Sequence, residues 1–135
     1  MADLPIKLVV VTPEMTVLDE SVDFVVAPLF DGELGVAAGH APVIGRLGYG
    51  ELRYRIGGEN HRYFVEGGFV QIADDVVSVM TGKAMLVSEI DVAEARQQLD
   101  AAIARSAAGA EAAARDRDIA QARGKLRVAK GGSSH

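Results

Sequence analysis

The sequence predicts a mainly β protein with an α-helical appendage: an N-terminal antiparallel β-sandwich over residues 1–87, a C-terminal two-helix hairpin over 88–130 and a disordered tail over 131–135. Val, Ile, Leu, Met, Phe and Tyr number 38 in residues 1–87 but only seven in 88–135. In contrast, 14 of the 21 Ala lie in the later segment. Because β-branched and aromatic residues favour strands and Ala favours helices, we expect the two segments to fold differently.

Short apolar runs between turn signals predict the strands of the first segment. Glu51–Ile56 alternates strictly between apolar and polar residues, and His61–Glu66 continues after the turn signal Gly57–Asn60, which predicts a β-hairpin with one wet face. No long helical stretch interrupts the strands, so parallel βαβ topology is not expected. The other predicted strands are Ile6–Val11, Val22–Ala27, Phe69–Ala73, Val76–Met80 and Ala84–Val87.

Helical periodicity replaces the strand pattern after Val87. Asp91 followed by Glu94 resembles a capping box that begins a helix, with Ser88 and Asp91 as a competing start. A turn is expected at Ser106–Gly109, after which a second helix runs until the glycines at 131 and 132. The two apolar stripes are Ala95, Leu99, Ala102 and Ile103 in the first helix, and Ala112, Ile119, Ala122 and Leu126 in the second.

The predicted hairpin has little apolar surface to bury. Its stripes hold four large aliphatic residues, and a fully buried Leu or Ile contributes only about 1.5–3 kcal/mol. Ordering the backbone costs about 1–2 kcal/mol per residue. We therefore expect a hairpin that is helical but loosely docked, which suits either a part that changes partners or a plain stabilising appendage.

Charge and composition exclude several classes of protein. The net charge of −5 argues against a nucleic-acid binder, and the lack of Cys excludes disulfides, thiolate metal sites and thiol nucleophiles. No run approaches the roughly 20 apolar residues of a membrane span, and Met1–Lys7 does not resemble a signal peptide. Any association with a membrane is therefore expected to depend on a partner.

Residues for catalysis are sparse. The chain has no G-x-x-x-x-G-K-[ST] loop, G-x-G-x-x-G turn, H-E-x-x-H helix or G-x-S-x-G elbow. His40 and His61 are 21 residues apart without a third ligand nearby, so no metal site is expected. The glycine pair in Glu66–Phe69 could cradle a phosphate, but a bulge is the commoner role, and Asp74-Asp75 is expected to be a turn.

One segment, Asp31–Pro42, does not resemble an ordinary connecting loop between strands. Its three Gly, one Pro and one His predict a tightly folded loop that presents Glu33 and His40 outward. Such a loop is either a structural turn or a surface for protein contact.

Three segments resemble the epsilon subunit of the F-type ATP synthase, the rotary, proton-translocating enzyme. They are Gly32–Pro42, which follows G-E-L-G-(I/V)-x-x-G-H-A-P, Gly67–Ile72, which reads G-G-F-V-Q-(I/V), and Ile90-Asp91 before the Ala-rich helices. Their order and spacing match that family over almost the whole chain. The resemblance implies a ten-stranded β-sandwich with a helical hairpin, and a non-catalytic rotor subunit of the central stalk that needs no cofactor.

Partners also follow from the resemblance. It implies binding to the gamma subunit and to the membrane c-ring, on the cytoplasmic face of the bacterial inner membrane. The hairpin of this family either folds against the sandwich or extends along gamma toward the alpha and beta catalytic subunits, where it restrains ATP hydrolysis. Glu33 and His40 are implied to face the c-ring and the gamma foot, with Ala38 at a position where many members have Pro.

Two further sites on the hairpin follow from the resemblance. Some bacterial members bind ATP through I/L-D-x-x-R-A; Ile90 and Asp91 match this motif, but Glu94 replaces its Arg and would repel a triphosphate. In this family the extended hairpin contacts an acidic loop of the beta subunit. The resemblance therefore implies that this contact is made by three cations that share one helix face at i, i+4 and i+7. These are Arg123, Arg127 and Lys130.

A different class of function remains as the alternative. The chain could be a free-standing β-sandwich module that binds proteins and dimerises through its helical tail. An isolated enzyme is the third possibility. Co-purification with alpha, beta and gamma chains would distinguish a rotor subunit from a free-standing module and from an isolated enzyme.

Overall fold

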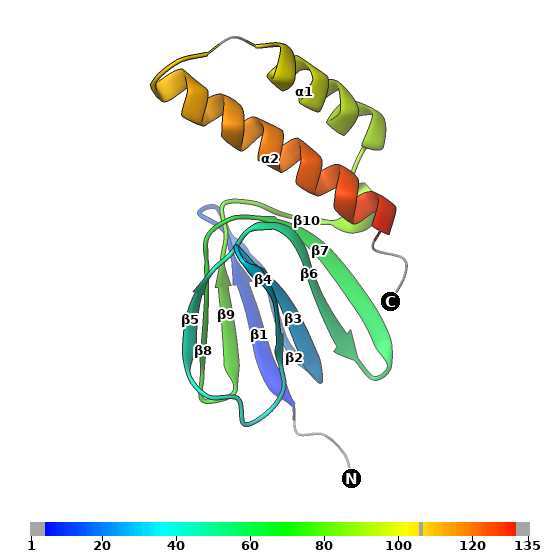
Figure 1. Ribbon diagram of the computed structural model, residues 1–135. Coiled ribbons are helices and arrows are strands. Elements are labelled where there is room, and N and C mark those ends of the chain that lie inside the picture. Colours follow the sequence, from blue (N-terminus) through cyan, green and yellow to red (C-terminus); the bar gives the residue numbers. More distant parts are fainter. Residues whose placement is uncertain (1–4, 106, 132–135) are drawn as a thin grey trace. The chain divides into compact units, whose positions relative to one another are not determined.

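The computed structural model describes residues 5–105 and 107–131, which form ten strands followed by two helices (Figure 1). The strands are β1 (Ile6–Val11), β2 (Thr16–Val22), β3 (Phe24–Leu29), β4 (Gly32–Val36), β5 (Val43–Arg46), β6 (Tyr49–Ile56), β7 (Glu59–Glu66), β8 (Phe69–Ala73), β9 (Val76–Met80) and β10 (Ala84–Leu86). A 3-10 turn, η1 (Val87–Glu89), leads to α1 (Val92–Ala104) and α2 (Ala110–Gly131). Of the predicted tail 131–135, Gly131 belongs instead to α2, and residues 132–135 lie outside the described residues, as does Ser106 of the predicted turn.

Two five-stranded sheets make the sandwich that the sequence predicts. Their strand orders are β2-β1-β9-β8-β5 and β10-β7-β6-β3-β4. The core between them contains Leu8 and Ile72 from one sheet and Val25 and Leu52 from the other, all almost fully buried. Leu8, Leu52 and Ile72 alternate with more exposed residues along their strands, because successive side chains of a strand point to opposite faces.

One strand pair departs from the predicted antiparallel arrangement. β1 lies parallel to β9, with Lys7 opposite Val76 and Val11 opposite Met80. A parallel pair needs a long connection between its strands. Here seven other strands lie between β1 and β9 in the chain, so no crossover helix is needed.

Several predicted strand boundaries were wrong. The predicted strand Val22–Ala27 is broken at Asp23, where β2 ends and β3 begins, and the hairpin turn is only Gly57-Gly58 because β7 already begins at Glu59. The predicted loop Asp31–Pro42 begins with a strand, β4, which pairs with β3 at the edge of its sheet. Edge pairing orders this glycine-rich segment despite its weak strand pattern.

The glycine pair at 67 and 68 makes a corner between β7 and β8. Gly67 N–H donates to the carbonyl of Gly48 at 3.1 Å, and Glu66 N–H donates to the carbonyl of Lys83 at 3.1 Å. A phosphate cradle would need these N–H groups to point at a ligand. Because both are used within the sandwich, the corner has a structural role.

The helical segment forms the predicted hairpin, in which α1 and α2 pack on each other. Ala95, Leu99 and Ala102 of α1 are buried, but Ile103, predicted for the same stripe, is 46% exposed. In α2, Ala122 is buried as predicted, whereas Ile119 and Leu126 are only half-buried.

Polar contacts add to this packing within the hairpin. Arg105 donates to the Asp118 carboxylate at 2.8 Å, and Arg115 donates to the carbonyl of Ile103 at 3.2 Å. The second contact satisfies a carbonyl at the end of α1 that has no partner within its helix. Because the three side chains in these contacts are all at least partly exposed, the contacts add only modest stability.

The chain divides into two compact units, Met1–Met85 and Leu86–His135. We propose that residues 1–87 form an independently folding domain, because the buried core described above lies entirely within them. A fragment ending at Val87, which retains β10, should unfold in a single cooperative transition in urea. A molten or aggregated fragment would show instead that the hairpin belongs to the folding core.

Candidate functional site

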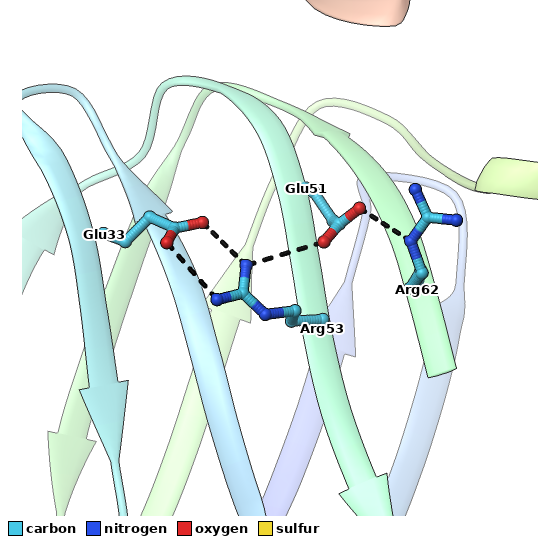
Figure 2. Close-up of polar contacts among 4 residues, drawn as sticks. All are labelled: Glu33, Glu51, Arg53 and Arg62. Carbon is cyan, nitrogen blue, oxygen red and sulfur yellow. Dashed lines mark hydrogen bonds and ion pairs between the residues drawn. The ribbon is translucent and has the colours of Figure 1, made fainter. Parts of the chain in front are cut away.

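Four charged side chains form a ladder on one face of the sheet that contains β4, β6 and β7 (Figure 2). Arg53 binds the carboxylate of Glu33 at two points, with N···O distances of 2.7 and 3.3 Å. Glu51 lies on the other side of Arg53, at 3.5 Å, and accepts a hydrogen bond from Arg62 Nε at 2.7 Å. The ladder Glu33, Arg53, Glu51 and Arg62 thus alternates in sign along its length.

Strand register explains the order of the ladder. Arg53 and Arg62 stand directly opposite each other on β6 and β7, an arrangement that is destabilising for like charges. Glu51 removes this conflict because its carboxylate contacts both guanidinium groups, and its side chain is only 12% exposed. The hydrogen bond from Arg53 to Glu33 raises the pKa of Arg53 above its ordinary value, so Arg53 keeps its charge.

The two candidate contact residues of the Gly32–Pro42 segment occupy different local structures. Glu33 lies on β4 rather than in a loop, and its half-exposed carboxylate is held by Arg53. His40 lies after β4 in a turn where its N–H donates to the carbonyl of Ala37 at 3.3 Å. Its ring atom Nδ1 lies 2.7 Å from the carbonyl oxygen of Ala41. The structure therefore positions Glu33 and His40 through separate contacts.

Exposed apolar side chains gather on the outer face of the other sheet, a feature that was not predicted from the sequence. Phe69 stands opposite both Arg46 and Met80, and Ile44 shares their face two residues along β5. Ile44 is 74% exposed and Phe69 54%. The Arg46 guanidinium lies 4.7 Å from the ring centroid of Phe30, which is also exposed. We call Phe30, Ile44, Phe69 and Met80 the outer apolar patch.

Such a patch is a candidate surface for a protein partner. Scattered exposed apolar residues are normal on a protein, but neighbouring ones across adjacent strands mark interaction surfaces. A strand with a solvent-exposed face normally has polar residues at its outward positions. The apolar residues Phe69 and Met80 at such positions were the signal in the sequence.

At the start of α1, Asp91 and Glu94 have structural roles. Asp91 caps the helix by accepting a hydrogen bond from the Glu94 N–H at 3.0 Å. The Glu94 side chain does not complete the capping box but accepts from Gln98 Nε2 at 3.2 Å. Ile90, the remaining match to the ATP motif, is half-buried. The carboxylates of Asp91 and Glu94 give this helix start a negative charge, which disfavours the binding of a triphosphate.

We expect ATP to leave the stability of the isolated chain unchanged, because a ligand stabilises only a protein that it binds. The thermal unfolding midpoint should be the same with and without millimolar MgATP. Glu94→Arg, which restores the residue of the motif, is the matched variant for the same measurement. A saturable rise of the midpoint for the unaltered chain would contradict this expectation.

The three cations predicted to share a helix face lie on α2 and are all exposed. Arg123, Arg127 and Lys130 fall within the last three turns of the helix, at the spacing that places them on one side. Cations here also complement the dipole of their own helix, an effect of about 0.3–1 kcal/mol. Their exposure leaves them accessible to an acidic partner.

Within residues 5–105 and 107–131, no three His, Asp or Glu side chains are grouped so that they could hold a metal ion. None of the helices in this described part is long and apolar enough to span a membrane.

Comparison with known proteins agrees on one family. The model of the β-sandwich domain of the ATP synthase delta/epsilon chain matches residues 5–87. The ATP synthase epsilon chain of Rhodopirellula baltica is 49% identical over 128 residues, which cover 94% of this chain and 100% of the relative. The epsilon chain of Dehalococcoides mccartyi is 37% identical over 134 residues, with 96% of each chain covered.

Solved structures give the same result for the fold. A chain of the Euglena gracilis mitochondrial ATP synthase, in its OSCP/F1/c-ring assembly, has a TM-score of 0.77 at 28% identity and covers 100% of this chain and 83% of its own. A chain of the Tetrahymena thermophila mitochondrial ATP synthase central stalk and c-ring has a TM-score of 0.73 at 17% identity, with 96% and 100% covered. The similarity thus extends over both the strands and the helices.

Proposed function

The chain belongs to the epsilon-chain family of the F-type ATP synthases, as its motifs predicted, and on this premise we propose that it works in the central stalk, coupling the gamma subunit to the c-ring. It is a subunit of the synthase and not itself the catalyst. The observation that carries the proposal is the match to a whole epsilon chain at 49% identity, which includes the hairpin as well as the sandwich. We place the chain on the cytoplasmic face of a bacterial inner membrane, held there by its partners.

The sandwich offers two surfaces for these partners. The outer apolar patch suits gamma, because an interface with a permanent partner buries apolar side chains at its centre. Glu33 and His40 suit the polar loops of the c-ring and the foot of gamma, because both carry groups that can form hydrogen bonds at the surface.

Removing the charge of Glu33 and the ring of His40 should uncouple the assembled synthase. In proteoliposomes, the complex carrying Glu33→Gln and His40→Ala should pump at least about twofold fewer protons per ATP hydrolysed, since each lost contact at an interface costs about 0.5–1.5 kcal/mol. The control is Glu59→Gln, which removes an exposed carboxylate at the tip of the β6–β7 hairpin. Equal pumping ratios for the three complexes would contradict the proposed contact.

The hairpin is proposed to restrain ATP hydrolysis. Two helices that bury mainly alanines are weakly held, which favours a segment that can exchange one partner for another. Arg123, Arg127 and Lys130 would hold the extended hairpin against an acidic loop of the beta subunit.

A further inference from the structure

We propose that Asp75 is the positioning residue of the loop Ala37–Pro42: its carboxylate clamps Gly39 and thereby fixes the place of His40. Asp75 lies 36 residues away in the chain, in the turn between β8 and β9, yet its Oδ1 accepts a hydrogen bond from Gly39 N–H at 2.7 Å. The inference rests on the proposed contact of His40 with the c-ring and gamma.

The turn that carries Asp75 has an unusual backbone. Asp74 and Asp75 have φ values of 53° and 62°, and they close a two-residue hairpin in which Ala73 stands opposite Val76. This is the pattern of a type I′ turn, for which Gly is the preferred second residue. A non-glycine residue at that position points to a role for its side chain. The bond to Gly39 supplies that role.

The turn is anchored at the backbone as well. The carbonyl of Asp75 accepts a hydrogen bond from Lys7 N–H at 2.9 Å, which ties the turn to the start of β1. The Asp75 carboxylate is therefore presented from a fixed point of the sandwich, and the bond to Gly39 transmits that position to the loop.

The loop itself needs such a clamp. The hydrogen bond between Ala37 and His40 defines a four-residue turn, and Gly39 at its third position has a φ of +83°, the value of a type II turn. Pro at the second position would favour this turn, but the residue there is Ala38. Without a rigid residue, the external bond from Asp75 selects this conformation of the loop.

The clamp acts on His40 through the adjoining peptide. Because a carbonyl oxygen only accepts, Nδ1 of His40 carries the hydrogen in its contact with Ala41, and in the neutral ring Nε2 is left as the acceptor. The orientation of the ring thus depends on the backbone of residues 39–41. Asp75 sets the direction in which Nε2 can meet a partner.

Asp75→Gly tests the clamp, because glycine suits the positive φ of the turn and removes only the carboxylate. In the full-length chain, NMR should show hydrogen exchange at the Gly39 amide rising roughly tenfold, the effect of losing one charge-assisted hydrogen bond. The nitrogen shifts of His40 should change from the Nδ1–H tautomer toward a mixture. Asp75→Asn keeps an acceptor oxygen, so its Gly39 exchange rate should lie between those of the unaltered chain and Asp75→Gly.

Binding to the synthase then shows whether the Asp75–Gly39 hydrogen bond is needed for the proposed contact of His40 with the c-ring and gamma. Added to a complex that lacks this chain, Asp75→Gly should bind roughly three- to tenfold more weakly, in proportion to the fraction of loops in the competent conformation. Ala38→Pro in the same chain should restore binding, because it favours the turn without the carboxylate. A role confined to the stability of the β8–β9 turn would not produce this rescue.

His40→Ala in the same binding assay distinguishes a failure of the Asp75 clamp from a failure of the proposed His40 contact. If His40→Ala weakens binding while Asp75→Gly binds like the unaltered chain, the inference is overturned and the contact stands. If His40→Ala also binds normally, the contact itself fails and the inference fails with it. Unchanged exchange at Gly39 in Asp75→Gly would overturn the clamp directly.

Discussion

Gly68→Ala should be the most destabilising single-methyl substitution in the sandwich, lowering the free energy of unfolding by about 3 kcal/mol or more, because overpacking and backbone strain each cost about 1–3 kcal/mol. An added Cβ would lie 1.9 Å from the carbonyl oxygen of Met80 and 2.9 Å from Cα of Thr81. Both are backbone atoms that cannot rotate away. The φ of +103° at Gly68 also disfavours any L residue.

The neighbouring glycine provides the control for this substitution. At Gly67, φ is +67° and an added Cβ would come no closer than 4.0 Å to the nearest atom, the ring of Tyr49. Gly67→Ala should therefore cost only about 1–2 kcal/mol, the strain of a left-handed residue. Urea unfolding of the three chains measures both costs. Equal losses for the two variants would show that β9 shifts easily and that the corner is not tightly packed.

Removal of the basic face of α2 is expected to release ATP hydrolysis in the assembled synthase. If each exposed ion pair contributes about 0.3–1 kcal/mol, changing Arg123, Arg127 and Lys130 together to Ala should shift the hairpin out of its extended position by roughly fivefold or more. Hydrolysis should rise accordingly, with no change in assembly. Raising the salt concentration should reduce the difference, because it weakens the same contacts in the unaltered chain.

A charge-conserving variant is the control for the basic face. Arg123→Lys with Arg127→Lys keeps all three charges on α2 and should leave hydrolysis near that of the unaltered complex. Identical hydrolysis by the complexes with and without the three charges, measured at low ionic strength, would show that the face is only a solvated helix end.

The strands with strong local patterns were the ones that the sequence predicted well. Ile6–Val11, Phe69–Ala73 and Val76–Met80 occur as predicted, because each has apolar residues bounded by turn signals. β2, β4 and β5 were missed, and all three lie at the edges of their sheets, where pairing with one neighbour compensates for a polar or glycine-rich sequence. The remaining edge strand, β10, was predicted because its residues form a short apolar run.

The helical stripes were predicted less well for a related reason. Val128 of α2 is buried but lies outside the predicted stripe, and α2 contacts both α1 and η1. A helix that is packed by two elements does not bury a single stripe. Ile103 stays exposed because the buried face of α1 is made by Ala95, Leu99 and Ala102.

Of the candidate site, the sequence could identify residues but not their partners. Glu33 and His40 stood out within a short motif. Arg53, which holds Glu33 from 20 positions away, and Asp75, which holds Gly39 from 36 away, had no visible link to that motif. Such pairs are created by the register of strands and the packing of turns, and neither follows from a local pattern.

Affinity purification of the tagged full-length chain from the membranes of its own organism, in mild detergent, decides whether this chain is a stalk subunit. The chain should elute with the alpha, beta and gamma subunits and the c-ring in a constant ratio, and the eluate should hydrolyse ATP. Recovery of the chain without these subunits, as a monomer or as a dimer formed through its helices, would contradict membership of the central stalk and favour a free-standing binding module.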